Sequence, residues 1–206
     1  MRPRHVLIVL VVALCAAPTI WLALLLLSQL SDRASGPGGG PPEPIRQHSQ
    51  LDTIVVRVVD GDTLVARVGD RAERVRLIGV DTPETVSPSK PVQCYGKQAS
   101  DHLKSLLPEG TAVRLQTDAD THDVYGRLLA YVYRRADGMF VNLELARDGY
   151  ASLLTFPPNV AHEPQFSAAV DRAHRQRLGL WGTCGGPGVA LADTPTTPPR
   201  DGGSGR

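Results

Sequence analysis

The sequence predicts an α+β fold in which a small closed barrel of five strands carries about three helices, preceded by one N-terminal apolar helix. Short strand-like segments, separated at first by Asp-Gly and Gly-Asp steps, occupy much of the folded region. Three other segments place apolar residues at helical spacing, one after the third strand and two near the end. The N-terminus is a long uncharged run. These observations predict the order of the elements.

The first 30 residues contain the apolar run VLIVLVVALCAAPTIWLALLLL, residues 6–27. A helix of this length can cross a hydrocarbon core of about 30 Å. Arg2 and Arg4 precede it, which leaves the N-terminus in the cytoplasm and the remaining chain outside. The run resumes at Ile20 after a stretch of small residues, so a membrane signal-anchor is favoured over a cleaved signal peptide. With the helix uncleaved the protein belongs to the cell membrane, and with the helix cleaved it is secreted.

Two segments outside the folded domain should have no hydrophobic core of their own, one before the domain and one after it. Residues 31–50 form a Gly- and Pro-rich linker, and residues 185–206 should be a disordered tail. The predicted folded domain is residues 51–184, near the size at which a single core is stable. Residues 51–186 contain 16 Lys and Arg against 17 Asp and Glu, so the domain does not attract polyanions by overall charge. Binding to nucleic acid would have to depend on a local site.

The strand-like segments are rich in Val, Leu and Tyr, and they are TIVVRVV, TLVARV, ERVRLIGV, AVRLQT and RLLAYVYRR. The turn residues between the first three predict an antiparallel meander. The helical segments cover residues 95–107, 141–149 and 163–179, and the last has Pro164 in its first turn. Five strands with helices in these positions favour an OB-fold β-barrel.

Three cysteines occur, and Cys15 lies in the apolar run. Outside the cytoplasm the other two, Cys94 and Cys184, most simply form one disulfide, closing a loop of about 90 residues. Two unpaired thiols are the alternative. Neither cysteine has a C-x-x-C partner, so a zinc site is not supported.

Four acidic residues lie at predicted strand ends, in VVDGDT and GVDTPET: Asp60, Asp62, Asp81 and Glu84. Carboxylates brought together repel one another and need protons, cationic partners or a metal ion. Oxygen ligands without His or Cys favour Ca²⁺ or Mg²⁺ over zinc. A simple hairpin turn at the first pair is the alternative.

An EF-hand is excluded, because its loop would need an oxygen ligand at Leu64, glycine at Val65 and glutamate at Arg71. Two arginines favour a catalytic site instead: Arg76 precedes the second acidic pair, and Arg127 opens the fifth strand. Each alone is typical of a protein surface. A metal ion, a carboxylate and two bidentate cations together suit the attack of water on a phosphodiester.

In combination these stretches resemble the staphylococcal nuclease-like, or thermonuclease, family. The resemblance spans about residues 53–181, in the order VVDGDT, RLIGVDTPET, YGKQAS, DVYGRLLAYVY, VNLELARDGYA and GLW. It implies an OB barrel with three helices. It also implies Ca²⁺-dependent hydrolysis of DNA and RNA, cleaving the 5′ P–O bond and leaving 3′-phosphate ends.

The resemblance assigns a role to each candidate residue. Asp62 and Asp81 would be carboxylate ligands of Ca²⁺, Thr82 would contribute its backbone carbonyl, and Asp60 would reach the ion through water. Glu84 would deprotonate or position the attacking water. The two phosphate-binding arginines would be Arg76 and Arg127.

One departure from the family concerns base stacking. The family's stacking tyrosines are replaced here in YASLLTFPPN, so stacking would depend on Phe156 or Tyr125. The histidines, His122 among them, show no metal-ligand spacing and are interpreted as structural or surface residues. We expect a monomer that acts on nucleic acid and is tethered to a membrane. The alternative is a catalytically weak OB module that binds nucleic acid or a protein partner.

Overall fold

The computed structural model describes residues 45–85 and 92–191. The predicted N-terminal helix, and the linker and tail beyond those limits, lie outside the described residues, so these predictions stand as made. Within the described ranges, no helix is both long and apolar enough to cross a membrane.

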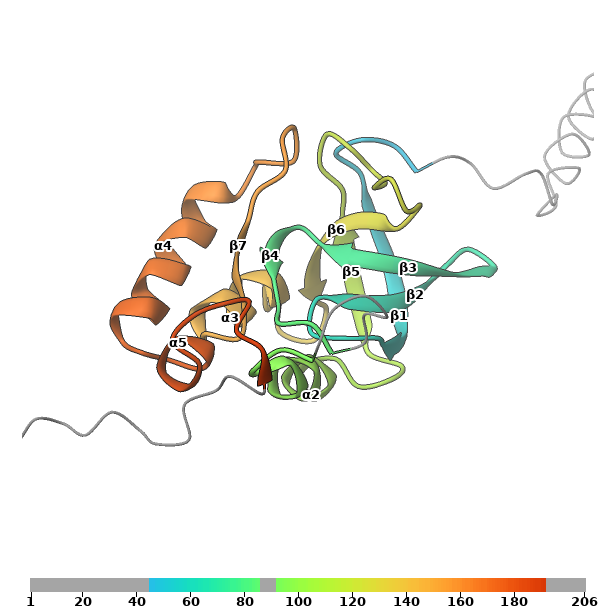
Figure 1. Cartoon of the computed structure of the whole chain (residues 1–206). Coiled ribbons are helices and arrows are strands. Elements are labelled where there is room, and N and C mark those ends of the chain that lie inside the picture. Colours follow the sequence, from blue (N-terminus) through green and yellow to red (C-terminus); the bar gives the residue numbers. More distant parts are fainter. Residues whose placement is uncertain (1–44, 86–91, 192–206) are drawn as a thin grey trace, which may run out of the picture. The chain divides into compact units, whose positions relative to one another are not determined.

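The central feature is a closed barrel of five strands in the order β1-β2-β3-β6-β5 (Figure 1). Its strands are β1 (Gln50–Val58), β2 (Thr63–Val68), β3 (Arg71–Leu77), β5 (Ala112–Gln116) and β6 (Leu128–Arg134). The first three form the predicted antiparallel meander. The barrel closes through a parallel pair, β3 with β6, and antiparallel pairs of β5 with β6 and with β1. The predicted five-stranded α+β fold is confirmed.

The third predicted strand is divided in two. Gly79 has a φ of 86°, and a Cβ there would lie 2.4 Å from the ring of Phe166, so glycine is required at this bend. The following residues form β4 (Gly79–Asp81), which leaves the barrel and pairs with β7 (Ser152–Leu154). This small second sheet was not predicted, and it places Asp81 at a strand end beside the barrel.

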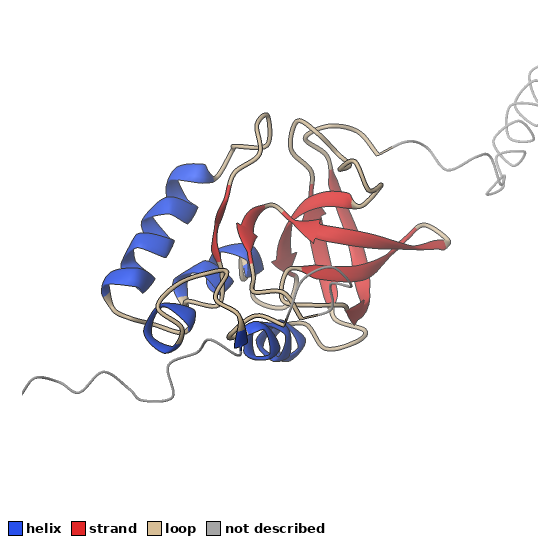
Figure 2. Cartoon of the chain, in the orientation of Figure 1, coloured by secondary structure: helices blue, strands red, loops and turns tan. Residues whose placement is uncertain are grey.

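The helices lie to the left of the barrel and below it in the view of Figure 2. They are α2 (Gly96–Leu106), α3 (Val141–Arg147), α4 (Glu163–Arg175) and the short α5 (Leu180–Thr183). The first three match the predicted segments, and α5 is an additional turn. Phe166 of α4 and Leu145 of α3 are almost fully buried and extend the barrel core outward.

A buried asparagine joins the barrel to the helices. Asn142 of α3 is fully buried, and its Nδ2 donates to the backbone oxygens of Ile78 (2.9 Å) and Ala130 (3.1 Å). Its Oδ1 accepts the backbone N–H of Val132 at 2.9 Å. One side chain therefore satisfies backbone groups on β6 and in the bend between β3 and β4.

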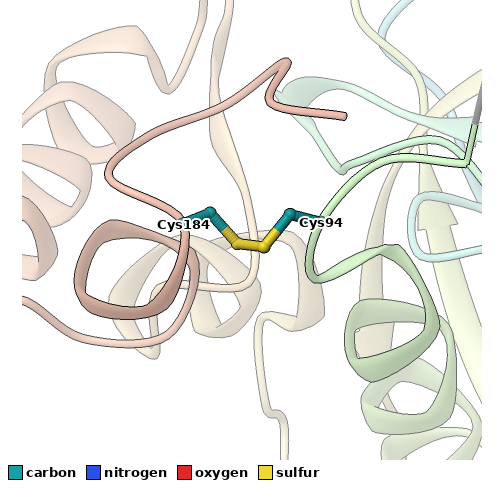
Figure 3. The surroundings of a disulfide bond; sticks show 2 residues. All are labelled: Cys94 and Cys184. Carbon is teal, nitrogen blue, oxygen red and sulfur yellow. A yellow bond between two sulfur atoms is a disulfide. The ribbon is translucent and has the colours of Figure 1, made fainter. Parts of the chain in front are cut away.

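A disulfide joins Cys94, just before α2, to Cys184 at the end of α5 (Figure 3). The Cα atoms are 6.0 Å apart, and the two residues are separated by 90 positions. The backbone N–H of Cys94 also donates to the oxygen of Val189, and that of Leu191 to the oxygen of Val92. The end of the described chain is thus held against the segment that follows the second acidic pair.

Candidate active site

The turn between β1 and β2 gives the two neighbouring aspartates different surroundings. Asp60 Oδ1 accepts the backbone N–H of Asp62 at 3.2 Å, which stabilises the turn. Asp62 is 7% exposed and points its carboxylate across to Thr82, whose N–H and hydroxyl donate to Oδ2 at 3.0 and 3.2 Å. Its Oδ1 accepts the hydroxyl of Thr63 at 3.0 Å. Thus Asp60 is bound to the turn and Asp62 to the neighbouring strand end.

The glycine between them is required by packing. A Cβ on Gly61 would lie 2.6 Å from Oγ1 of Thr82 and 2.9 Å from the Cβ of Ala99. Such distances are well inside van der Waals contact. Only glycine lets this turn approach Thr82 closely enough for the hydrogen bonds of Asp62 to form.

Arg76 lies between the two acidic stretches and is 9% exposed. Its Nη2 lies 2.9 Å from Asp81 Oδ1 and 3.1 Å from Asp62 Oδ2. Its Nη1 donates to the backbone oxygens of Leu77 and Val80, both at 2.7 Å. The guanidinium therefore holds the two carboxylates around one positive charge.

Glu84 follows three residues after Asp81 and is anchored through its backbone. Its N–H donates to Oε1 of Gln93 at 2.9 Å, and its carbonyl accepts the N–H of Gln93 at 2.9 Å. Its Oε1 accepts the N–H of Thr85 at 3.1 Å. Gln93 precedes the disulfide residue Cys94, so the disulfide also restrains the segment that supports Glu84.

Arg127 enters the same region from the loop before β6. Its Nε donates to Oδ2 of Asp123 at 2.6 Å, and its guanidinium lies 5.4 Å from the centre of the Tyr125 ring. The N–H groups of Tyr125 and Arg127 donate to Asp123 Oδ1, both at 2.9 Å. Within residues 45–85 and 92–191, no group bonds the two Nη atoms of Arg127. These atoms are available for an anion.

All seven of these predicted site residues line one cleft of about 580 Å³: Asp60, Asp62, Arg76, Asp81, Thr82, Glu84 and Arg127. Two exposed aromatic side chains stand at its walls, Tyr125 (81% exposed) and Phe156 (68%). Asn159 connects the loops that carry them, since it accepts from the N–H of Asp120 at 2.7 Å and donates to its oxygen at 3.0 Å. Both residues considered for base stacking thus face the same cleft.

The carboxyl group of Asp60 in this turn has a raised pKa. Burial, together with the neighbouring Asp62 carboxylate, raises the pKa of Asp60 to about 6. Two carboxylates this close disfavour each other's ionised form, and a cation near them would lower the pKa again.

The donor atoms fit a hard cation. Among the described residues, no three His, Cys, Asp or Glu side chains are grouped to hold a metal ion by themselves. Two carboxylates nevertheless converge on one cationic nitrogen of Arg76, next to Thr82. Carboxylate oxygens, completed by backbone oxygen and water, are the ligands that Ca²⁺ prefers.

Three contributors to the cleft were missed or underestimated by the sequence analysis: Asp123, Asn159 and His122. Asp123 holds Arg127, and the only sequence signal for this pair is its spacing of four residues. Asn159 gives no sequence signal, because its partner is 39 residues away. His122, interpreted as structural or surface, lines the cleft and bonds Thr121.

Comparison with known proteins shows the family of the chain. The model of the family described as staphylococcal nuclease homologue matches residues 74–183, more than half of the chain. The chain belongs to the staphylococcal nuclease family. It is therefore a nuclease, an enzyme that hydrolyses phosphodiester bonds, as the resemblance predicted.

Individual family members are similar over most of the folded region. A thermonuclease of Staphylococcus intermedius is 46% identical over 128 residues, which cover 62% of this chain and 74% of that protein. A thermonuclease of Staphylococcus hyicus is 42% identical over 127 residues, covering 62% and 73%. Endonuclease YncB of Bacillus subtilis is 36% identical over 148 residues, covering 71% and 69%. The match to the family model, residues 74–183, runs from within β3 to α5.

Proposed function

We propose that this nuclease uses Ca²⁺ to hydrolyse DNA or RNA outside the cytoplasm, cleaving the 5′ P–O bond and leaving 3′-phosphate ends. The observation that carries the proposal is the convergence in one cleft of the Asp62–Arg76–Asp81 group, Glu84 and Arg127. This set contains each group that hydrolysis of a phosphodiester requires.

Ca²⁺ would be held by Asp62 and Asp81, with the backbone carbonyl of Thr82 and water completing its ligands. Asp60 would act through one of those waters, since its carboxylate already bonds the turn. The ion would neutralise negative charge on the phosphate oxygens. The same two carboxylates now share Arg76, so a cation would compete with this guanidinium for them.

Arg76 and Arg127 bind the phosphate in this proposal. Arg127 has both Nη atoms directed to no described partner, and Asp123 fixes its Nε. Arg76 would turn its Nη2 from the carboxylates toward a phosphate oxygen, while Nη1 stays bound to two backbone oxygens. Two planar guanidinium groups suit the equatorial oxygens of the phosphoryl group.

Glu84 acts on the water. Its carboxylate accepts or orients a proton of the water as the oxygen attacks phosphorus. A P–O bond forms to that oxygen, the bond to the 5′ oxygen breaks, and the leaving oxygen becomes a 5′-hydroxyl after taking up a proton. The products are a 3′-phosphate end and a 5′-hydroxyl end.

Location outside the cytoplasm and attachment to a membrane are proposed from the apolar run of residues 6–27. The Cys94–Cys184 disulfide suits an oxidising compartment. Edman sequencing of the mature N-terminus, with fractionation of membrane and medium, tests this part. A mature protein that begins at Met1 in the cytoplasmic fraction would contradict it.

The activity is tested by the release of acid-soluble nucleotides from denatured DNA and from RNA, first with Ca²⁺ and then with a chelator. We expect chelator-sensitive release, and we expect Glu84→Gln and Arg127→Ala to lower kcat by about 10²–10⁴-fold with unchanged circular dichroism. Near-normal rates would remove those two roles. Binding of nucleic acid by a folded protein without any release would favour the alternative of a non-catalytic OB module.

A further inference from the structure

A second hollow, of about 880 Å³, adjoins the cleft and leads toward the β2–β3 hairpin. It shares five lining residues with the cleft, so the two are continuous: Asp60, Glu84, His122, Tyr125 and Arg127. Its remaining wall is the first half of β3, which carries Arg71 and Arg74. This hollow, lined by residues 59–60, 71–74, 84, 122 and 125–127, is named the hairpin groove below.

Arg74 continues the line that starts at Arg76. Residues two apart on a strand project from the same face, about 7 Å from each other. The register agrees, because Arg76 pairs with Thr63 and Arg74 with Val65 on the same strand β2. Arg74 is therefore the next positive charge along β3 after the guanidinium that binds the scissile phosphate in the proposed function.

The two groove arginines are available for a ligand. Arg71 and Arg74 are exposed, and neither forms an ion pair or side-chain hydrogen bond within the described part of the chain. Some surface arginines are paired, such as Arg114 with Asp52 and Arg134 with Asp137, whereas among the described residues Arg71 and Arg74 are not. Glu73, Asp60 and Glu84 also line the groove, so its arginines would act as individual phosphate contacts and not through a net positive charge.

The junction of groove and cleft offers a stacking surface. The Tyr125 ring is 81% exposed there and carries the Arg127 guanidinium at 5.4 Å. Cations that follow a backbone, together with an exposed aromatic ring, are the features that bind single-stranded nucleic acid. The domain has no excess of positive charge to attract nucleic acid as a whole, so individual arginines beside the cleft gain importance.

We propose that the hairpin groove is a subsite for the nucleotides on one side of the scissile phosphate, with Arg71 and Arg74 binding their phosphates. This inference rests on the proposed function and extends it to substrate length. Contacts distant from the reacting bond form equally in the ground state and the transition state. They therefore lower KM for long substrates and leave kcat unchanged.

The test compares the double variant Arg71→Ala/Arg74→Ala with Arg172→Ala/Arg175→Ala. The control arginines are also exposed and also without ion pairs among the described residues, and they lie on α4, across the molecule from the hairpin (Figure 1). Both variants remove two positive charges, so overall electrostatics change alike. The substrates are a single-stranded 15-nucleotide DNA and a dinucleotide with one phosphodiester bond.

We expect the groove variant to raise KM for the 15-mer about tenfold at low salt, with kcat unchanged. The slope of log KM against log salt should decrease by about 1.4, the value for two lost phosphate contacts on a single strand. The groove variant should cleave the dinucleotide with the kcat and KM of the wild type. The control variant should behave as the wild type on both substrates. Arg74→Lys should recover part of the affinity for the 15-mer.

Equal KM values of groove variant, control variant and wild type for the 15-mer would overturn the subsite. An equal rise in KM for the 15-mer and the dinucleotide would also overturn it. So would a decrease in kcat. Failure of the proposed function looks different, because the wild type itself would then release no product from the 15-mer.

Discussion

Asp123 holds Arg127 in the cleft, and its replacement by asparagine tests that role. Asp123 Oδ2 accepts the Nε–H of Arg127 at 2.6 Å, while Oδ1 accepts two backbone N–H groups. Asparagine has nearly the size of aspartate, and its single amide oxygen can still accept the backbone N–H groups. It places a neutral amide against the guanidinium, so Arg127 loses its anchor while the loop keeps its turn.

The size of the expected effect follows from the burial of the Asp123–Arg127 pair. A hydrogen bond to a charged group contributes about 1.5–3 kcal/mol when buried. The side chains of Arg127 and Asp123 are 28% and 16% exposed, so solvent screening reduces this to about 1 kcal/mol of unfolding free energy. A misplacement of about 1 Å in a positioning contact costs up to about 100-fold in rate. We expect Asp123→Asn to lower kcat/KM by about ten- to 100-fold.

The stability effect should depend on pH. Partial burial alone would raise the pKa of Asp123, but hydrogen bonds from the backbone and side chain of Arg127 lower this pKa below its ordinary value. A carboxyl group with a lowered folded-state pKa stabilises the protein above its unfolded pKa of about 4 and loses this effect as pH falls through the folded value. The difference in unfolding free energy between wild type and Asp123→Asn should be full at pH 7 and shrink below about pH 4.

The assay is a double-mutant cycle on kcat/KM with Asp123→Asn and Arg127→Ala. If Asp123 acts only through Arg127, the double variant equals Arg127→Ala. Asp137→Asn is the matched control, because Asp137 likewise pairs with an arginine, Arg134, and accepts the N–H of Met139, away from the cleft. It should leave kcat/KM unchanged. Fully additive losses in the cycle would refute the positioning role.

Three further changes address the turn and the core. Asp62→Asn should raise the Ca²⁺ dissociation constant by at least about tenfold, and more than Asp60→Asn does, because only Asp62 is placed as a direct ligand; calorimetric titration measures both, and the reverse order would contradict the assignment. Gly61→Ala should cost about 2 kcal/mol in urea unfolding, since its Cβ would overlap Thr82; an unchanged midpoint would show that the turn yields freely. Asn142→Ala leaves buried backbone groups without partners and should lower Tm by about 10 °C in calorimetry, whereas a shift below 2 °C would mean that water replaces the amide.

Much of the site could be predicted because its residues lie in short local patterns. The acid pairs at residues 60–62 and 81–84 occupy turn or strand-end positions, and such positions depend on near neighbours in the sequence. The structure brings all four acids into one cleft with Arg76 and Arg127. It also joins Cys94 to Cys184, the pair that the cysteine count indicated. The roles of these residues in catalysis stay predictions.

Other features depend on contacts between distant segments and leave no local pattern. The division of the third strand at Gly79 is required by the Phe166 ring, 87 positions later, and it creates the β4–β7 sheet. The support of the cleft wall by Asn159 also depends on such a contact, because its partner Asp120 is 39 residues away. A pattern search within one window cannot detect partners that only folding brings together.

By itself the sequence determined the α+β barrel class, the order of the five barrel strands and three main helices, and the acids and arginines that line the cleft. Hydrophobic period and turn chemistry are local, and they specify elements and their ends. Only the tertiary structure decided how the barrel closes, that Asp60 bonds its own turn while Asp62 shares Arg76 with Asp81, and that a groove with Arg71 and Arg74 continues the cleft. The physical reason is that charges and hydrogen-bonding groups select partners by distance in space, which the chain sets only when its core is packed.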